Sequence, residues 1–431
     1  MNRIVQLSES HDVVASEDIF DTSGMKLLAK GKRVSAELQN RLLQRKLARP
    51  LEMALSVESA VSVGDVVTSC LEQLDILPLT KCFAGSQSAM ALLKTLKDVK
   101  LAPPVRLLLT AIHQHSPEEY SHNLITILIA VGIASRLRAT DHDAMVLMLS
   151  GLLHDFGLLY VNPELVKSTY RLGPAEWKYV AAHPLIGQLM IKELTALPPL
   201  VGECIALHHE RLDGSGYPNY VDINRTHRLG AWLAVADSVS AIMARGGDEA
   251  PTRIALALRV IPEEFDREAV GAVLQSMRGM GVSVGSGDKT CFDRAEQEME
   301  RLERAQELIR ERLAKKPDPM FATIGEALLI TLGNVAKSLR ATGVLDARKQ
   351  LMANVDDADL LAEMNQITFE VGWRMRNLAR NVHLRAEAAG GANLVAQCRD
   401  VIVVLDESSA QTETAVPAGT SPEAPATPAS S

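Results

Sequence analysis

The histidines of this chain are concentrated in one stretch, and their spacing restricts how that stretch can fold. Eight of the eleven histidines lie between residues 113 and 209. Apolar segments of helical length separate them, with Gly, Pro, Asn and Asp at the connections. Asp155 and Asp237 also lie in apolar surroundings, where a carboxylate needs a cation or strong donors because its burial is costly. We therefore expect the chemistry of the protein to lie in this region.

The composition predicts a mostly α fold. Apolar residues make up 47% of the 431 residues and aromatic residues only 4%, so Leu, Ala, Ile and Met dominate the apolar positions. Apolar periodicity and breaking residues predict five helices in the histidine-rich region. They cover residues 120–138, 143–156, 175–194, 199–210 and 227–244.

Charge and cysteine usage limit the partners and the compartment. The net charge of −8 argues against general binding to DNA, RNA or an anionic membrane. The five cysteines are scattered and form no CxxC pair, as in proteins of a reducing compartment. The N-terminus lacks a signal-peptide core, and the most apolar run, residues 123–134, is shorter than the ~20 residues that span a bilayer. We expect a cytoplasmic protein.

The N-terminal part reads as a small α+β unit over residues 1–62, followed by a helical linker over residues 63–99. A turn at residues 21–24 predicts a β-hairpin, and Ser35 is a candidate cap for a helix carrying Leu38, Leu42 and Leu47. We interpret this unit as a structural or docking appendage.

The C-terminal part is predicted to be helical over residues 291–390. Residues 293–316 carry one narrow apolar seam, which either pairs two chains in a homodimer or packs within its own bundle. Residues 391–431 are expected to be a linker and a disordered tail, because the end is rich in Ser, Thr, Pro and Ala.

A set of histidines and aspartates suggests metal chemistry. A single histidine is more often a hydrogen-bonded core or surface residue than a ligand. A set of imidazole nitrogens and carboxylate oxygens, however, suits Fe, Mn, Zn or similar divalent ions. Two such ions held close together can bridge a hydroxide and clamp the attacked and leaving oxygens of a phosphodiester. The pattern therefore favours metal-assisted hydrolysis of a phosphate ester.

The order of the motifs carries a specific resemblance. His122, "LLHDFG" at 152–157, "AHPLIG" at 182–187, "HHERLDGSGYP" at 208–218 and "AVADSVSA" at 234–241 follow one another at helix-sized spacings. Together they resemble the HD-GYP family of the HD phosphohydrolase superfamily, over about a third of the chain. We assign residues 100–290 to such a domain.

The resemblance implies an HD-type helical bundle that holds two or three divalent metal ions, often iron or manganese. It also implies hydrolysis of cyclic di-GMP to pGpG or GMP, with Asp155 bridging the metals in the catalytic centre. Glu118 matches a position where some members bind an extra metal, although it could equally be a helix-start acid that favours the dipole. The implied metal ligands are His122, His154, Asp155, His183, His208, His209, Asp237 and Glu118.

The chain also departs from the family pattern. Leu158 replaces the lysine of "HDxGK", Ile125 replaces an arginine, and Ser240 stands where a second aspartate is usual. Cationic groups near the phosphates are thus lost while the metal ligands remain. Lys167 matches a family lysine and is our candidate phosphate contact; Arg211 and Arg245 are weaker alternatives.

The loop at residues 213–218, here called the GYP loop, has two interpretations. It either holds the turn beside the metals, or it borders the substrate entrance and docks a cyclase domain of the GGDEF type. The residues concerned are Asp213, Gly214, Gly216, Tyr217 and Pro218.

The leading hypothesis is a cyclic di-GMP phosphodiesterase in bacterial signalling. The rival is a catalytically weak or inactive scaffold that binds metal, cyclic di-GMP or a GGDEF-type partner. A third hypothesis is a hydrolase that acts on a different nucleotide, but the GYP sequence of the loop argues against it. No sensory motif is readable, so the sequence gives no input signal.

Overall fold

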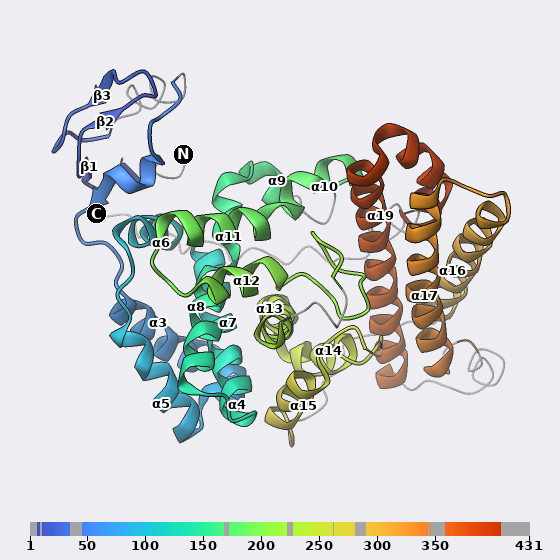
Figure 1. Ribbon diagram of the computed structural model, residues 1–431. Coiled ribbons are helices and arrows are strands. Elements are labelled where there is room, and N and C mark those ends of the chain that lie inside the picture. The colour runs from blue at the N-terminus through green and yellow to red at the C-terminus, as the bar shows by residue number, and fades with distance from the viewer. Residues whose placement is uncertain are drawn as a thin grey trace, which may run out of the picture.

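The computed structural model describes residues 7–8, 11–34, 45–167, 172–221, 227–261, 263–280, 290–343, 345 and 358–406. These residues are mostly helical, with two small antiparallel sheets of two strands each. The prediction of a mostly α fold with a small N-terminal α+β unit is therefore confirmed. Figure 1 shows the strands at one end of the molecule, a central group of helices, and a separate bundle of long helices at the other end.

The N-terminal unit contains the predicted hairpin. Strand β2 (Ile19–Phe20) pairs with β3 (Lys26–Leu28), while β1 (Val13–Ala15) pairs with β4 (Leu55–Val57), which follows the 3-10 helix η1 (Leu51–Ala54). In the turn, Oδ1 of Asp21 accepts hydrogen bonds from the backbone N–H groups of Ser23 and Met25. The predicted cap at Ser35 lies outside the described residues.

The helices of the centre form one continuous apolar core. This core joins buried residues of the N-terminal unit, such as Val13 and Leu55, to the long helices around Leu128 and Leu233. Residues 63–99, which we predicted to be a linker, are helical but belong to this core. The α-helices are α3 (Val63–Ile76), α4 (Lys81–Ala84), α5 (Gln87–Thr95), α6 (Pro103–His115), α7 (Pro117–Arg136), α8 (Asp141–Leu153), α9 (Pro163–Lys167), α10 (Pro174–Ala181), α11 (His183–Leu194), α12 (Pro199–Leu207), α13 (Arg228–Gly246), α14 (Ala250–Ala257) and α15 (Arg267–Ser276). Short 3-10 helices connect them: η2 (Pro78–Thr80), η3 (Leu96–Asp98), η4 (His154–Tyr160) and η6 (Gly247–Glu249).

Two predicted helices are interrupted at histidines. The helix predicted over 143–156 ends at Leu153, whose ψ is 0°, and the chain tightens into the 3-10 helix η4 from His154. The helix predicted over 175–194 is two helices, because Pro184 cannot continue α10 and instead occupies the first turn of α11. Both breaks place a histidine at the start of a new helix.

The C-terminal helices α16 (Thr290–Ala314), α17 (Pro319–Ala341) and α19 (Ala358–Asp406) form a bundle around a second apolar core. The seam of α16, including Met299, Leu302 and Ile309, lies in this core. Of the two predicted alternatives, this is the one in which the seam packs within its own bundle. The linker predicted from residue 391 is wrong up to residue 406. Gly391, with φ 61°, kinks the helix, which then continues and buries Leu405. The homodimer through these helices stays a prediction.

By length and composition alone, three helical segments in the described part of the chain could cross a membrane: Asp141–Tyr160, Pro319–Ala341 and Leu360–Asp406. Of the apolar window in the first, 67% is buried inside the fold, against 28% in the third. The expected absence of a membrane partner and the cytoplasmic location therefore stay predictions.

Candidate metal centre

The fold brings seven of the predicted ligands into two adjoining groups. Asp155, His183, His208 and His209 form one group, and His122, His154 and Asp237 form the other. Within each group, one potential ligand atom per residue lies within 4.8 Å of the others. They come from α7, from η4 directly after α8, from the start of α11, from the end of α12 and from α13.

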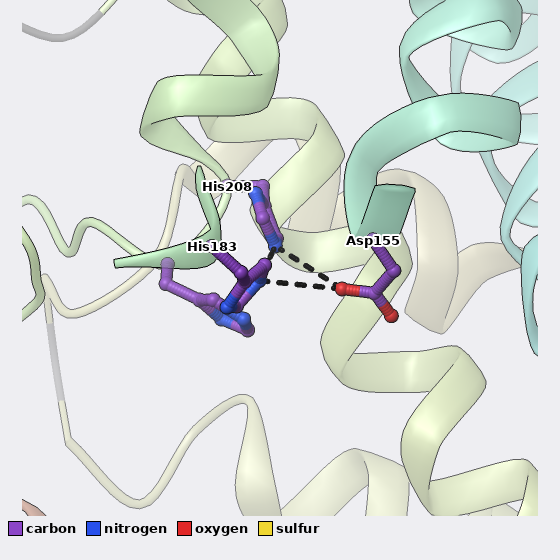
Figure 2. A group of neighbouring side chains, drawn as sticks. Asp155, His183 and His208 are labelled. Atoms are coloured by element: carbon purple, nitrogen blue, oxygen red, sulfur yellow. Dashed lines mark hydrogen bonds and ion pairs between the residues drawn. The ribbon is translucent and has the colours of Figure 1, made fainter. Parts of the chain in front are cut away.

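Asp155 connects the two groups through its two oxygens. Its Oδ1 lies 3.3 Å from Nε2 of His183 and 3.8 Å from Nε2 of His208, as Figure 2 shows. Its Oδ2 lies 3.3 Å from Nε2 of His154 and 3.7 Å from Nε2 of His122. One oxygen thus serves each group, which is the arrangement of a bridging carboxylate.

Three of the histidines are oriented by the same local device. Nδ1 of His154, His183 and His208 donates to the backbone carbonyl three residues earlier, at 2.9, 2.8 and 2.6 Å respectively. A carbonyl oxygen only accepts, so the proton of each neutral ring is on Nδ1 and the lone pair is on Nε2. All three Nε2 atoms therefore point into the centre as potential ligands.

The fourth ring, His122, is oriented by Ser240. The Ser240 hydroxyl lies 3.0 Å from Nδ1 of His122 and 3.0 Å from its backbone carbonyl oxygen. Because the hydroxyl proton goes to the carbonyl, the oxygen accepts from Nδ1–H, and Nε2 again faces the centre. From the sequence, Ser240 was noted only as a replacement of an aspartate. Its contact with His122 depends on the packing of α13 against α7, which local sequence does not reveal.

The donor set fits divalent cations. Nε2 of His122 is 3.2 Å from Nε2 of His154, and the same distance separates Nε2 of His183 from Nε2 of His208. Lone pairs that face one another so closely repel unless positive charge lies between them. Asp237 adds Oδ1 at 3.1 Å from His122 and Oδ2 at 3.6 Å from Nδ1 of His209. Imidazole and carboxylate donors of this kind suit Fe, Mn or Zn.

The electrostatics point the same way. Burial alone would raise the pKa of Asp155, but His154 and His183 hold it well below its usual range. Burial would likewise lower the pKa of His154, yet Asp155 and Asp237 raise it well above its ordinary value. Burial, reinforced by His154 and His183, lowers the pKa of His208 to about 3. The centre thus keeps its carboxylates ionised and His208 neutral, which are the forms that bind a metal.

Two predicted site residues are exposed and are not members of these groups. Glu118 is exposed in the first turn of α7 and belongs to neither group. Lys167 ends α9 with 75% of its side chain exposed and lies 3.6 Å from Glu164. Arg211, in contrast, is almost buried and lies 3.6 Å from Glu264. Arg245 is exposed near the end of α13.

The replaced family positions are apolar in the structure as well. Leu158 packs against a small cluster that includes Val161 and Trp177. Ile125 is only 4% exposed and lies in the main core. Neither position brings a cation to the metal groups.

Hydrogen bonds and a ring contact with neighbouring residues hold the GYP loop beside the centre. Glu210 is buried and accepts from the backbone N–H groups of Asn219 (2.6 Å) and Val221 (3.1 Å). Burial, opposed by these donors, raises the pKa of Glu210 to about 7. Tyr217 stacks on the ring of His209 with 4.7 Å between centroids. The turn itself is closed by Oδ1 of Asp213, which accepts from Ser215 N–H.

These features define a helical domain with two adjoining His/Asp groups, both of which are contacted by Asp155. The family model of the HD domain matches residues 106–269. This part of the chain thus matches the HD domain family, and the predicted resemblance to the HD-GYP proteins is confirmed. An HD domain implies binding of divalent metal.

Two curated relatives and one solved structure illustrate the similarity. A 3'3'-cGAMP-specific phosphodiesterase of Vibrio cholerae is 30% identical over 150 residues, which are 35% of this chain and 32% of that protein. A cyclic di-GMP phosphodiesterase of Pseudomonas aeruginosa is 29% identical over 138 residues, 31% of this chain and 33% of that one. The chain thus spans about a third of the length of these relatives. An HDG"Y"P protein from Bdellovibrio bacteriovorus aligns with 62% of this chain and 95% of its own, at a TM-score of 0.34 and 14% identity.

Proposed function

We propose that this protein is a metal-dependent phosphodiesterase that hydrolyses cyclic di-GMP to pGpG or GMP. The observation that carries the proposal is the position of Asp155, with one oxygen toward each of two histidine pairs. A pair of adjoining cation sites can stabilise both the attacking and the leaving oxygen of an in-line displacement at a phosphodiester. The relatives named for cyclic di-GMP and 3'3'-cGAMP support a cyclic dinucleotide as the substrate class.

The proposal includes two or three divalent ions, iron or manganese. His183, His208 and His209 would hold one of them with Oδ1 of Asp155. The other would be held by His122, His154 and Asp237 with Oδ2 of Asp155. When bound, such ions neutralise phosphate charge and activate water as a nucleophile at neutral pH. Glu118 remains the proposed contact for a third ion.

The protein's own residues supply the geometry. The hydrogen bonds that Nδ1 of His154, His183 and His208 donates to backbone carbonyl oxygens hold each ring with Nε2 toward the centre. Asp155 fixes the spacing of the two groups. Such preorganised ligands need little rearrangement when charge develops on the phosphate. Lys167 is the proposed phosphate contact: its ion pair with Glu164 is exposed and weak, which leaves the ammonium group available to an anion.

The test is hydrolysis by the full-length protein, purified without oxygen and loaded separately with iron or manganese. Cyclic di-GMP, 3'3'-cGAMP and cyclic di-AMP are supplied in parallel, and chromatography identifies the products. We expect cyclic di-GMP to be cleaved fastest, with pGpG or GMP released. Faster cleavage of another cyclic dinucleotide would contradict the substrate, and full metal loading without any cleavage would contradict the enzyme.

A second candidate function is a metal-stabilised scaffold with little or no turnover. The apolar surroundings of Leu158 and Ile125 favour it, because relatives of this family carry cations at these positions to meet the phosphates. In this reading the domain binds cyclic di-GMP or a GGDEF-type partner. Binding of the dinucleotide to the metal-loaded protein without release of product would support the scaffold.

A further inference from the structure

The face of the GYP loop is covered by a helix of the same chain. On α19, Nδ2 of Asn381 donates to the carbonyl oxygen of Ser215 at 2.8 Å. The Tyr220 hydroxyl, just after the loop, donates to the carbonyl oxygen of Asn381 at 3.1 Å. The cavity left between the loop and helices α17 and α19 measures about 30 Å³, room for about one water molecule. The loop therefore packs directly against the C-terminal bundle.

A stack of side chains continues from α19 to a metal ligand. The guanidinium group of Arg380 lies over the ring of Trp177, 5.0 Å from its centroid, and also donates to the carbonyl oxygen of Leu172 at 2.7 Å. Trp177 in turn packs edge-on against Tyr217 at 5.2 Å, and Tyr217 stacks on His209 at 4.7 Å. Close-packed aromatic contacts transmit displacements because little free volume separates them.

A buried network of charges forms a second connection. Arg374 of α19 donates to Glu264 at 2.9 Å, and Glu264 lies 3.6 Å from Arg211. Arg211 lies two residues after His209 and donates to the carbonyl oxygen of the intervening Glu210 at 2.9 Å. Arg374 and Glu264 are 6% and 4% exposed, so these charges depend on one another for compensation. Without α19, the carboxylate of Glu264 would keep, among the described residues, its ion pair with Arg211 but lose the one with Arg374.

We propose that α19 is a positioning element of the metal centre. Its docking holds the GYP loop and sets Tyr217 against His209, so a signal that shifts the C-terminal bundle changes the metal group to which His209 belongs. The partner of the loop face is thus the chain's own helix, with Asn381, Arg380 and Trp177 as positioning residues. The regulatory meaning rests on the proposed function, whereas the mechanical connection does not.

The experiment compares full-length Asn381→Ala with Arg399→Ala, an exposed residue of the same helix. Hydrogen exchange is followed over residues 208–221, and the affinity for manganese is measured by titration. The amides of Leu212, Tyr217 and Val221 report well because each donates to an acceptor within the protein. We expect Asn381→Ala to accelerate exchange in the loop at least tenfold and to weaken manganese binding about tenfold, as loss of supporting contacts does at other metal sites. Arg399→Ala should change neither.

A measurement on the unchanged protein covers the case in which Asn381→Ala does not fold. Exchange is recorded at increasing urea concentrations, and manganese release is followed in parallel. We expect residues 208–221 and residues 374–385 to lose their protection from exchange at the same urea concentration. One manganese ion should be released at that concentration as well. Retention of loop protection and of metal after 374–385 has opened would overturn the proposal, as would a folded Asn381→Ala variant with unchanged exchange and affinity. Neither readout requires turnover, so a protein that binds metal but hydrolyses nothing would overturn only the proposed function.

Discussion

The Ser240 hydroxyl accepts a hydrogen bond from Nδ1 of His122 and donates one to its backbone carbonyl oxygen, both at 3.0 Å. A residue of α13 thereby sets the ring of a ligand on α7. Nε2 of that ring is left facing His154 and Asp237. Ser240 thus orients one of the candidate metal ligands through a hydrogen bond.

We predict that Ser240→Ala weakens metal binding by about 10- to 100-fold, because the ring of His122 loses the acceptor that fixes its tautomer. Competition with a chelator measures the affinity. Ser238→Ala is the matched control, since Ser238 lies on the same helix and donates to Ala234 rather than to a ligand. An equal loss in both variants would show that the effect is not specific to His122.

The close packing of the GYP loop predicts that Gly216→Ala is destabilising. A Cβ atom there would overlap backbone atoms of His209, Glu210 and Arg211, which cannot rotate away. We expect a loss of about 1–3 kcal/mol in the free energy of unfolding, measured by urea denaturation of the metal-free protein. Gly271→Ala, in helix α15 with open space around the added methyl group, should be neutral or stabilising.

The sequence predicts the candidate ligands of this centre better than it predicts the backbone and the contacts that position them. The resemblance to the HD-GYP family, carried by the order of the motifs, implied all seven members of the two groups. The breaks at His154 and His183 were missed, because apolar periodicity runs through both positions. The supporting contacts of Ser240 and Glu210 were also missed, because their partners are not adjacent to them in the sequence.

The C-terminal region shows a different limit. Residues 391–406 were predicted to be a linker, yet Leu394 and Leu405 complete the second apolar core. The contact of Asn381 with Ser215 spans 166 residues, so local patterns carry no trace of it. Helix content and ligand chemistry were therefore predictable, and the relation of the bundle to the site was not.

We predict that Leu158→Lys raises the turnover of the metal-loaded protein about tenfold or more. A cation near the phosphates would supply transition-state stabilisation, and each 1.36 kcal/mol corresponds to a factor of ten in rate. Initial rates with cyclic di-GMP give kcat and KM for both proteins. Leu158→Met serves as the control for repacking of the apolar cluster. If Leu158→Lys folds and binds metal but is no faster than Leu158→Met, the missing lysine does not limit the reaction.

Asp21 predicts an acid-dependent contribution to the stability of the N-terminal unit. Hydrogen bonds from the Ser23 hydroxyl and the Met25 backbone N–H, with Arg45 nearby, lower its pKa to about 2. Because this pKa is below the unfolded value of about 3.9, the contribution is complete above that value and is lost as the pH falls toward 2. Asp21→Asn should remove this pH dependence in acid titrations followed by circular dichroism. Identical titration curves for both proteins would contradict the assignment.

The central claim is that Asp155 bridges two adjoining metal sites, and electron paramagnetic resonance of the manganese-loaded protein tests it most directly. We predict the spectrum of a magnetically coupled manganese pair at two ions per chain. In Asp155→Asn, which keeps the shape of the side chain but loses one carboxylate oxygen, the coupled signal should disappear and at least one ion should be lost. Two uncoupled six-line manganese signals in the unchanged protein, or an unaltered coupled spectrum in Asp155→Asn, would contradict the account.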